Sequence, residues 1–157
     1  MTRLQGSVEQ FVPVPADAVY GVITDVDRLP EWNDVIQRVE ERPPALTEGA
    51  DWVVHIRPPG MPGWDSRSTV LAVDGDARTF RYRSRTDDGN PSYADWEWEV
   101  QAADGGSMVR CSWDLHPVTR TRRLILSRIR NRALRREVPK SIAAMARVAA
   151  ADADGGA

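Results

Sequence analysis

The sequence predicts an α+β fold in which one long C-terminal helix packs against an antiparallel sheet. Residues 118–151 are the only stretch with sustained helical spacing, and apolar side chains recur there every three to four residues, at Leu134, Val138, Ile142 and Met145. Most of the preceding chain consists of short alternating segments separated by turn residues, which is typical of strands. A helix with one apolar stripe must bury it, and the sheet is the partner that the chain offers.

Length and cysteine content favour a single domain in a reducing compartment. The 157 residues are enough for one hydrophobic core. The one cysteine, Cys111, cannot form an internal disulfide. The sequence shows no apolar segment of signal-peptide or membrane-spanning length. We therefore expect a cytoplasmic protein with one domain over residues 1–151 and a frayed tail over residues 152–157.

Charge is distributed unevenly along the chain. The formal net charge is −2, but ten of the 21 Lys and Arg residues and only one of the 23 acidic residues lie between Arg120 and Arg147. Such a basic segment could contact an anionic membrane, an acidic carrier protein or nucleic acid. Attraction between a basic helix and an acidic body explains the same pattern. We favour this last reading and expect no nucleic-acid partner.

The first third of the chain predicts a strand followed by short helices. Residues 3–12 are expected to form the first strand. Pro15 suits an early helical position and Asp17 favours the positive end of a helix, so a short helix should follow. Pro30 disfavours helix at Leu29 and ends this segment. A second short turn around residues 30–34 then leads to the second strand.

The middle and the end of the chain predict six more strands and the long helix. The strands are expected at about 35–42, 50–57, 66–74, 78–85, 92–102 and 107–116, separated by Pro, Gly and Asp clusters. In the helix, Pro139 cannot donate to the carbonyl of Arg135. We therefore expect a kink or break near residues 135–138, which would separate a basic piece, 120–132, from a packed piece, 139–150.

Alternation along the later strands separates a charged face from an aromatic face. Arginines at 81, 83 and 85 would lie beside acidic residues at 95, 97 and 99, which predicts cross-strand ion pairs on the solvent side. The opposite face carries aromatic rings and should point at the helix. The strand at 66–74 offers small side chains, Ser66, Ser68 and Ala72, on one face. Small side chains opposite large rings favour a slot over a filled layer.

The segment PVPADAVYGVITDVDRLPEWNDVIQRV at residues 13–39 resembles the opening of the START-like (SRPBCC/Bet v 1-like) superfamily, in its polyketide cyclase/dehydrase and lipid-transport branch. The resemblance extends to VPKSI at residues 138–142 in the last helix, and so covers nearly the whole chain. It implies the helix-grip fold: a curved seven-stranded antiparallel sheet wrapped around a long C-terminal helix, with two short helices after strand one.

The same resemblance implies a ligand cavity between the sheet and the long helix. A protein of this kind would bind a hydrophobic small molecule, aromatic or polycyclic and polyketide- or lipid-like. The residues expected to line the cavity are Trp52, Val54, Phe80, Tyr82, Trp96, Trp98, Cys111, Trp113, Ile142 and Met145. Met61 and Trp64, in the loop at residues 58–64, would form a lid or fold back on the core.

Two other functions stay open at this point. One is a polyketide cyclase, aromatase or dehydratase, because an arginine and hydroxyl residues inside the cavity are proposed to orient the polyketide in such relatives. Here Ser68 matches the serine, Val70 occupies the place of the arginine, and Arg67 faces outward unless a bulge intervenes. Tyr82 and Ser68 are therefore the candidate catalytic residues. The other is a membrane-associated lipid or quinone carrier that uses the basic residues 120–136.

Motifs for metals and cofactors are missing from the sequence. His55 and His116 have no Cys, His or carboxylate neighbours at metal-ligand spacing, so we expect both to be surface or structural residues. No G-x-S-x-G, P-loop or dinucleotide-binding fingerprint is present. Cys111 lies among apolar residues, which favours an inert core thiol. The sequence therefore predicts no metal and no cofactor.

Overall fold

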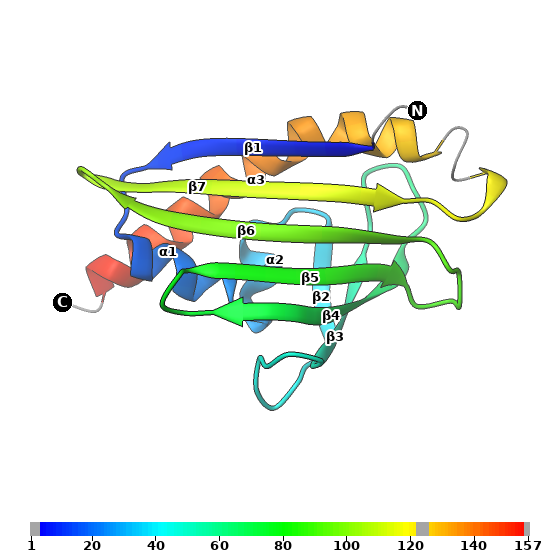
Figure 1. The fold of residues 1–157 in the computed structure, drawn as a ribbon, viewed down its shortest axis with the longest axis horizontal. Helices are drawn as coiled ribbons and strands as arrows, with labels where there is room; N and C mark the ends of the chain where they lie inside the picture. The colour runs from blue at the N-terminus through cyan, green and yellow to red at the C-terminus, as the bar shows by residue number, and fades with distance from the viewer. Residues whose placement is uncertain (1–3, 122–125, 156–157) are drawn as a thin grey trace.

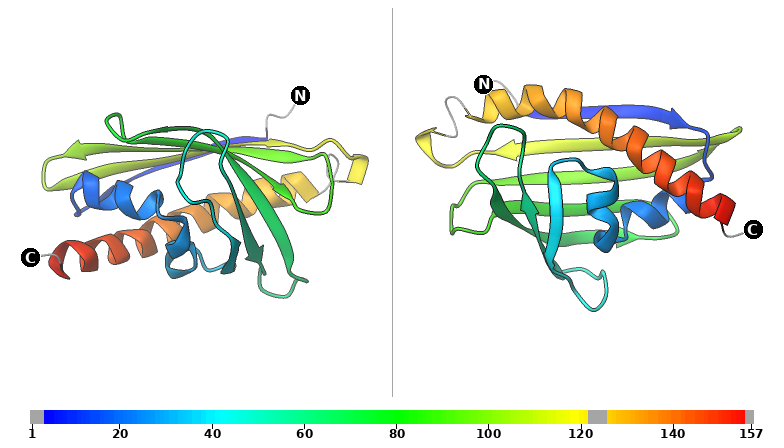
Figure 2. Two further views of the ribbon diagram at one scale, coloured as in Figure 1. Left: turned by 90° about the horizontal axis from the view of Figure 1, so that it is seen from below. Right: turned by 180° about the vertical axis from the view of Figure 1, so that it is seen from behind.

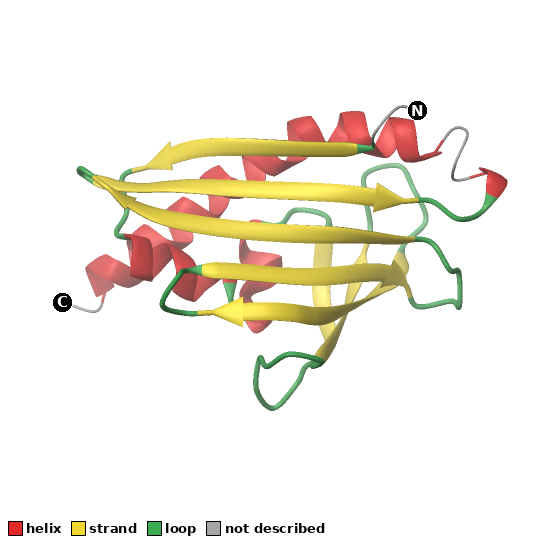
Figure 3. Ribbon diagram, viewed as in Figure 1, coloured by secondary structure: helices red, strands yellow, loops and turns green. Residues whose placement is uncertain are grey.

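The structure is a computed structural model that describes residues 4–121 and 126–155. Within these residues, seven strands form one antiparallel sheet and the helices lie on one of its faces (Figures 1 and 3). The elements run in the order β1 (Gln5–Val12), α1 (Ala16–Ile23), η1 (Val26–Arg28), α2 (Leu29–Trp32), β2 (Ile36–Glu41), β3 (Asp51–Ile56), β4 (Trp64–Asp74), β5 (Thr79–Thr86), β6 (Tyr93–Ala103), β7 (Gly106–His116) and α3 (Ser127–Gly155).

The sheet is a meander closed by its first strand. Its order is β1-β7-β6-β5-β4-β3-β2, so β2 to β7 each pair with their neighbours in sequence and β1 pairs with β7. The sheet curls, so that β2 and β3 turn behind the other strands (Figure 1). The long helix α3 crosses the inner face diagonally, with α1 and α2 beside it (Figure 2). This is the helix-grip fold, and the predicted fold class is confirmed.

A kink or break was predicted near residues 135–138, and helix α3 is continuous through Pro139, so the break does not occur. The axis of the helix bends along its length (Figure 2), as expected where proline removes one backbone hydrogen bond. Val138 and Ile142 are buried on either side of the proline. This packing holds both halves against the same core, so the helix bends without ending. Residues 122–125 of the predicted basic piece lie outside the described residues.

Helix α3 also extends beyond residue 151, where the sequence places its end. The helix continues to Gly155, although residues 152–157 were expected to be a frayed tail. Asp152 accepts hydrogen bonds from the guanidinium of Arg28, which also binds Glu31 at 2.6 Å. Residues 152–155 are therefore helical, and Asp152 connects the end of α3 to η1.

The two faces of the sheet differ as the alternation predicts. On the outer face Arg81 lies 3.3 Å from Glu97, and Arg83 lies 2.7 Å from Asp95. These exposed and half-exposed pairs each contribute little to stability. The aromatic rings of β5, β6 and β7 point inward, where α1 and α3 cover them.

A register shift in β4 corrects one sequence assignment. Val70 lies opposite Tyr82, but Ala72 lies opposite Arg81, because one extra residue bulges between them. Ser66 and Ser68 share the buried inner face as predicted, whereas Ala72 is out of phase with them. The bulge follows Arg67 and leaves this side chain on the outer face, 3.0 Å from Asp87.

The described residues include no helix that is both long enough and apolar enough to cross a membrane.

Candidate functional site

The inner face of the sheet is organised as rows of side chains that run across the strands. One row consists of Val70, Tyr82, Trp96, Trp113 and Gly6, each directly opposite the next. A second row, one step closer to α1, contains Phe80, Trp98, Cys111 and Val8. A third row, one step further from α1, contains Trp52, Ser68, Ser84, Ala94 and Leu115.

On β5, β6 and β7, burial of the inward side chains decreases with distance from α1. Phe80, Trp98 and Cys111 are buried, and their row is covered by α1 and by the later part of α3. Beyond them, five inward residues of β5, β6 and β7 keep partial solvent access: Tyr82, Ser84, Ala94, Trp96 and Leu115. These five adjoin one another across three strands. We call them the open patch, and they are the most accessible part of the aromatic inner face.

Above the open patch, α3 contributes a polar residue to its buried stripe. Ser127, Leu134 and Val138 of this stripe are buried, whereas Asn131, at the same helical spacing, is only half-buried. Its Oδ1 accepts a hydrogen bond of 2.8 Å from the indole N–H of Trp113. Because an indole nitrogen only donates, this bond fixes which way the Asn131 amide is turned. Asn131 was not predicted from the sequence as a site residue. The signal for it was a polar residue at a position within the apolar stripe of the helix.

A second indole makes the corresponding contact within the sheet. Trp96 Nε1 donates to Ser84 Oγ at 3.1 Å. The rings of Trp96 and Trp113 lie 6.2 Å apart, and Tyr82 stacks on Trp96 at 6.3 Å. The open patch is therefore an aromatic surface with a hydroxyl group beside it. Ser84 too was missed, although alternation along this strand places it on the same inward face as Phe80 and Tyr82.

Tyr82 remains a neutral phenol over a wide pH range. Burial raises its pKa well above the ordinary value of 10.0, and a hydrogen bond from Trp98 acts in the opposite direction but does not offset it. A phenol of this kind can donate a hydrogen bond to a bound molecule. It is poorly suited to act as a general base near neutral pH.

The other predicted ligand-binding residues lie deeper than Tyr82 and Trp96. Cys111 has no exposed surface, and burial raises the pKa of its thiol, which makes it an inert core residue as the sequence predicts. Protein atoms also enclose the remaining members of the predicted set: Trp52, Val54, Phe80, Trp98, Trp113, Ile142 and Met145. Their role in binding stays a prediction, and the accessible part of the set is Tyr82 and Trp96.

Ser68, the second candidate catalytic residue, lies on the inner face between Trp52 and Ser84. It is buried, so its hydroxyl is less accessible than that of Ser84. In the loop between β3 and β4, Met61 is 52% exposed. Trp64 is instead the first residue of β4 and is half-buried. The loop thus exposes one of the two apolar side chains that were expected to form a lid or to fold back.

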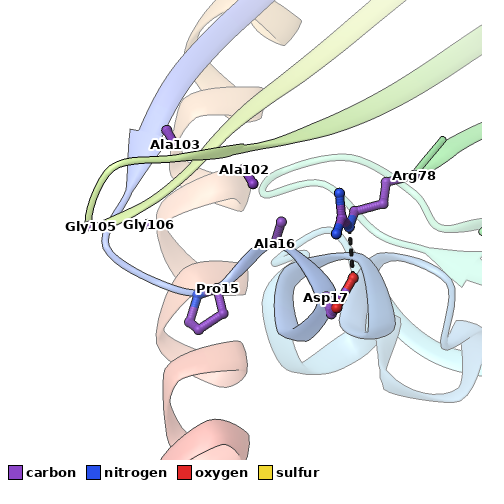
Figure 4. A pocket seen from close by; sticks show the side chains of 8 residues that line it. All are labelled: Pro15, Ala16, Asp17, Arg78, Ala102, Ala103, Gly105 and Gly106. Atoms are coloured by element: carbon purple, nitrogen blue, oxygen red, sulfur yellow. Dashed lines mark hydrogen bonds and ion pairs between the residues drawn. The ribbon is translucent and has the colours of Figure 1, made fainter. Parts of the chain in front are cut away.

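Two shallow hollows lie outside the inner face. One, of about 340 Å³, lies between the start of α1 and two hairpin turns, and Arg78 and Asp17 form an ion pair of 2.7 Å across it (Figure 4). The other, of about 380 Å³, lies at the β1 edge and is lined by Gln5, Gly6, Ser7, Arg110, Ser112, Trp113 and Arg135. Both are open to solvent, and the charges in the first are already paired.

The histidines lie on the outer side of the sheet. His55 Nδ1 lies 2.7 Å from Asp65 Oδ1, and Glu40 on the adjacent strand brings a third potential ligand atom within 4.8 Å of the other two. Sequence spacing could not show this cluster, because it combines three strands. Asp65 is hydrogen-bonded to His55 and Glu40 to Arg38, so these contacts account for the grouping. His116 stacks on Tyr93 at 4.5 Å.

The curved sheet, the long helix across it and the aromatic inner face define a helix-grip domain of the START-like superfamily. The model of the family described as "Polyketide cyclase / dehydrase and lipid transport" matches residues 3–150, and the chain belongs to this family. No curated protein matches the chain.

Solved structures with the same fold include Ara h 8.0201 and two aromatase/cyclases. Ara h 8.0201 is 19% identical with a TM-score of 0.73, over 94% of this chain and 97% of that chain. The Zhui aromatase/cyclase from a Streptomyces species is 19% identical with a TM-score of 0.72, over 95% and 94%. The di-domain aromatase/cyclase StfQ of the steffimycin pathway is 16% identical with a TM-score of 0.72, over 98% and 52%. At these identities the likeness concerns the fold.

Proposed function

We propose that this protein binds a hydrophobic, flat aromatic molecule, polyketide- or lipid-like, between the open patch and α3. The observation that carries this proposal is the partial solvent access of Tyr82 and Trp96 on an otherwise buried inner face. Large rings that keep water-accessible surface in a domain interior gain free energy when an apolar ligand covers them. The family description and the titles of the aromatase/cyclases support a ligand of this class.

Catalysis is the second candidate, because two of the similar structures are aromatase/cyclases. In this chain Tyr82 would donate a hydrogen bond to a carbonyl oxygen rather than remove a proton, since burial raises its pKa. Arg67 is held on the outer face by Asp87 and Glu41. Because no charged side chain is buried among the residues that the structure describes, binding is the better-supported function.

A carrier that works at membranes is the third candidate. Leu126, directly before α3, and Ile129, in its first turn, are 50% and 61% exposed beside the exposed Arg128 and Arg132. Such a surface suits an anionic bilayer. It would add a docking step to ligand binding and would leave the binding site unchanged.

Fluorene, a rigid and uncharged tricyclic hydrocarbon, tests the binding proposal directly. The six tryptophans give six indole N–H signals in the NMR spectrum of ¹⁵N-labelled protein. Fluorene should shift the signals of Trp96 and Trp113 most and that of Trp32, packed against Trp98 at the buried end, least. Trp96→Leu should weaken binding roughly 3- to 10-fold, the range for losing one aromatic contact.

Phe11→Leu is the matched control, because it removes an aromatic ring that is 46% exposed on β1. It should leave the affinity for fluorene unchanged. Absence of fluorene binding to the native protein, or equal losses in the two variants, would show that the open patch is not a binding surface.

A further inference from the structure

We propose that Asn131 and Ser84 are specificity-determining residues that make the site a hydrogen-bond donor to a neutral, carbonyl-bearing ligand. This inference rests on the proposed function, since it assigns a polarity to the same site. Neither residue was predicted from the sequence as a site residue. The ligand property that they would select is the direction of its hydrogen bonds.

Trp113 holds the Asn131 amide in one orientation. Trp113 can only donate, so the oxygen of Asn131 faces the indole at 2.8 Å and its NH₂ group must point elsewhere. Among the residues that the structure describes, no acceptor is bonded to this NH₂ group. Asn131 belongs to the stripe of α3 that faces the sheet, yet it is half-buried between buried neighbours. Asn131 therefore keeps accessible surface beside Trp113, which pairs directly with Trp96 of the open patch.

Trp96 orients the hydroxyl of Ser84 in a similar way. Its oxygen accepts the N–H of Trp96 at 3.1 Å, so its own hydrogen must point away from that ring. Within the described part of the chain no acceptor takes this hydrogen. Ser84 adjoins Ala94 in the open patch, and the small alanine side chain leaves the hydroxyl uncovered. Two neighbouring indoles, Trp96 and Trp113, thus each hold one polar group in an orientation that presents a donor.

The inner face has no buried charged side chain among the described residues. The only buried polar side chains among the described residues are serines: Ser66, Ser68, Ser92, Ser107 and Ser127. On α3 the half-buried Arg130 is paired with Glu137 at 2.9 Å, so neither offers an unpaired charge. An anionic ligand would lose its hydration without gaining a counter-ion, which is costly. A ketone or quinone oxygen needs only hydrogen-bond donors. A neutral carbonyl compound fits these groups better than a carboxylate.

The test uses three probes with one carbon skeleton: fluorene, 9-fluorenone and fluorene-9-carboxylate. The quantity measured is the ratio of the dissociation constants of fluorene and fluorenone, obtained from tryptophan fluorescence. Comparing this ratio between native protein and variants cancels the different hydrophobicities of the two probes. Each lost hydrogen bond should lower the preference for fluorenone roughly 3- to 10-fold.

Asn131→Asp is the key variant, because aspartate still accepts the N–H of Trp113 but has no donor when ionised. Asn131→Asp and Ser84→Ala should each reduce the preference for fluorenone, measured as the ratio of the two dissociation constants. Arg132→Gln, an exposed change one residue along α3, should leave the preference unchanged. The carboxylate should bind native protein more weakly than fluorenone.

The outcomes separate the two proposals. If fluorene and fluorenone both bind but the ratio is the same in native protein, Asn131→Asp and Ser84→Ala, the donor assignment is wrong and the binding function stands. Tighter binding of the carboxylate than of fluorenone would also overturn the assignment. If neither neutral probe binds native protein, both proposals are wrong.

Discussion

Trp113 occupies the space that a side chain at position 6 would need. A Cβ atom at Gly6 would lie 2.3 Å from Cζ2 and 2.5 Å from Cε2 of the Trp113 ring. The ring cannot move aside cheaply, because it is buried and its nitrogen is bonded to Asn131. Glycine at position 6 therefore allows the tryptophan to lie flat across the edge strand and to reach the helix.

Gly6→Ala should lower the free energy of unfolding by about 1–3 kcal/mol, the usual cost of overpacking a core. Chemical denaturation of the two proteins measures this difference. Gly21→Ala is the control, because Gly21 lies in α1 with open space around its α-carbon. Alanine is a better helix former, so this change should raise the free energy of unfolding by about 0.5–1 kcal/mol. Equal stability of Gly6→Ala and native protein would contradict the close packing of Trp113.

At the scale of residues, the sequence identifies which side chains point inward but not which of them stay accessible. Alternation along β5 and β6 is sufficient to place Tyr82 and Trp96 on the inner face. Whether a ring is enclosed depends on what lies above it. Phe80 stacks on Trp52 at 5.9 Å, a contact between strands that are not adjacent in the sheet, and no local pattern predicts it.

Among the elements, α3 shows how a helix end is fixed by distant residues. The hydrogen bond from Arg28 lowers the pKa of Asp152 below its ordinary value of 3.8. An acid with a lowered pKa in the folded state contributes stability above its unfolded pKa, and that contribution is lost as the pH falls through the folded value. The last turns of α3 should therefore loosen under acidic conditions.

The ¹³Cα chemical shifts of residues 150–154, recorded between pH 6 and pH 2, measure this loosening. Helical shifts should persist at pH 6 and decrease below about pH 3.8, the unfolded pKa of Asp152. Asp152→Asn should remove the pH dependence, and Asp154→Asn should keep it. A transition that is unchanged in Asp152→Asn would show that the contact with Arg28 does not hold the helix end.

The elements also show where sequence patterns stop being informative. The positions of all seven strands follow from turn residues and alternation, to within about two residues. The bulge between Val70 and Ala72 has no such signal, because one extra residue changes the phase without interrupting the strand. The continuity of α3 through Pro139 is likewise decided by packing on both sides of the proline.

For the whole molecule, the helix-grip architecture could be predicted because local and global patterns agree. One apolar stripe, seven strands and opposite charged and aromatic faces are compatible with few other arrangements. The degree of filling beneath the helix could not be predicted in this way. It depends on how the rings contact one another in three dimensions, and here they fill the end near α1 and leave the open patch partly uncovered.

Two weakly acidic side chains on the inner face, Cys111 and Tyr82, make the stability of the whole molecule sensitive to alkaline pH. Burial raises the pKa of Cys111 above 9.0 and that of Tyr82 above 10.0. In the unfolded chain both groups ionise near those ordinary values, while in the folded protein they stay protonated. A raised pKa gives stability that is fully present below the unfolded pKa and is lost as the pH rises towards the folded value.

The free energy of unfolding, measured by urea denaturation, should therefore be steady up to about pH 8 and should fall above pH 9. Each group contributes a slope of up to about 1.4 kcal/mol per pH unit. Cys111→Ala should reduce the slope from pH 9 upward, and Tyr82→Phe only above about pH 10.

Tyr20, whose pKa is also raised by burial, provides the matched control. Tyr20→Phe should act in the same pH range as Tyr82→Phe, but Tyr20 lies outside the open patch. Fluorene should protect the phenol of Tyr82 from ionisation and leave Tyr20 unaffected, because only the open patch is covered by a bound ligand. Equal alkaline slopes in the native protein and in Tyr82→Phe would show that burial does not raise the pKa of the Tyr82 phenol in the folded protein.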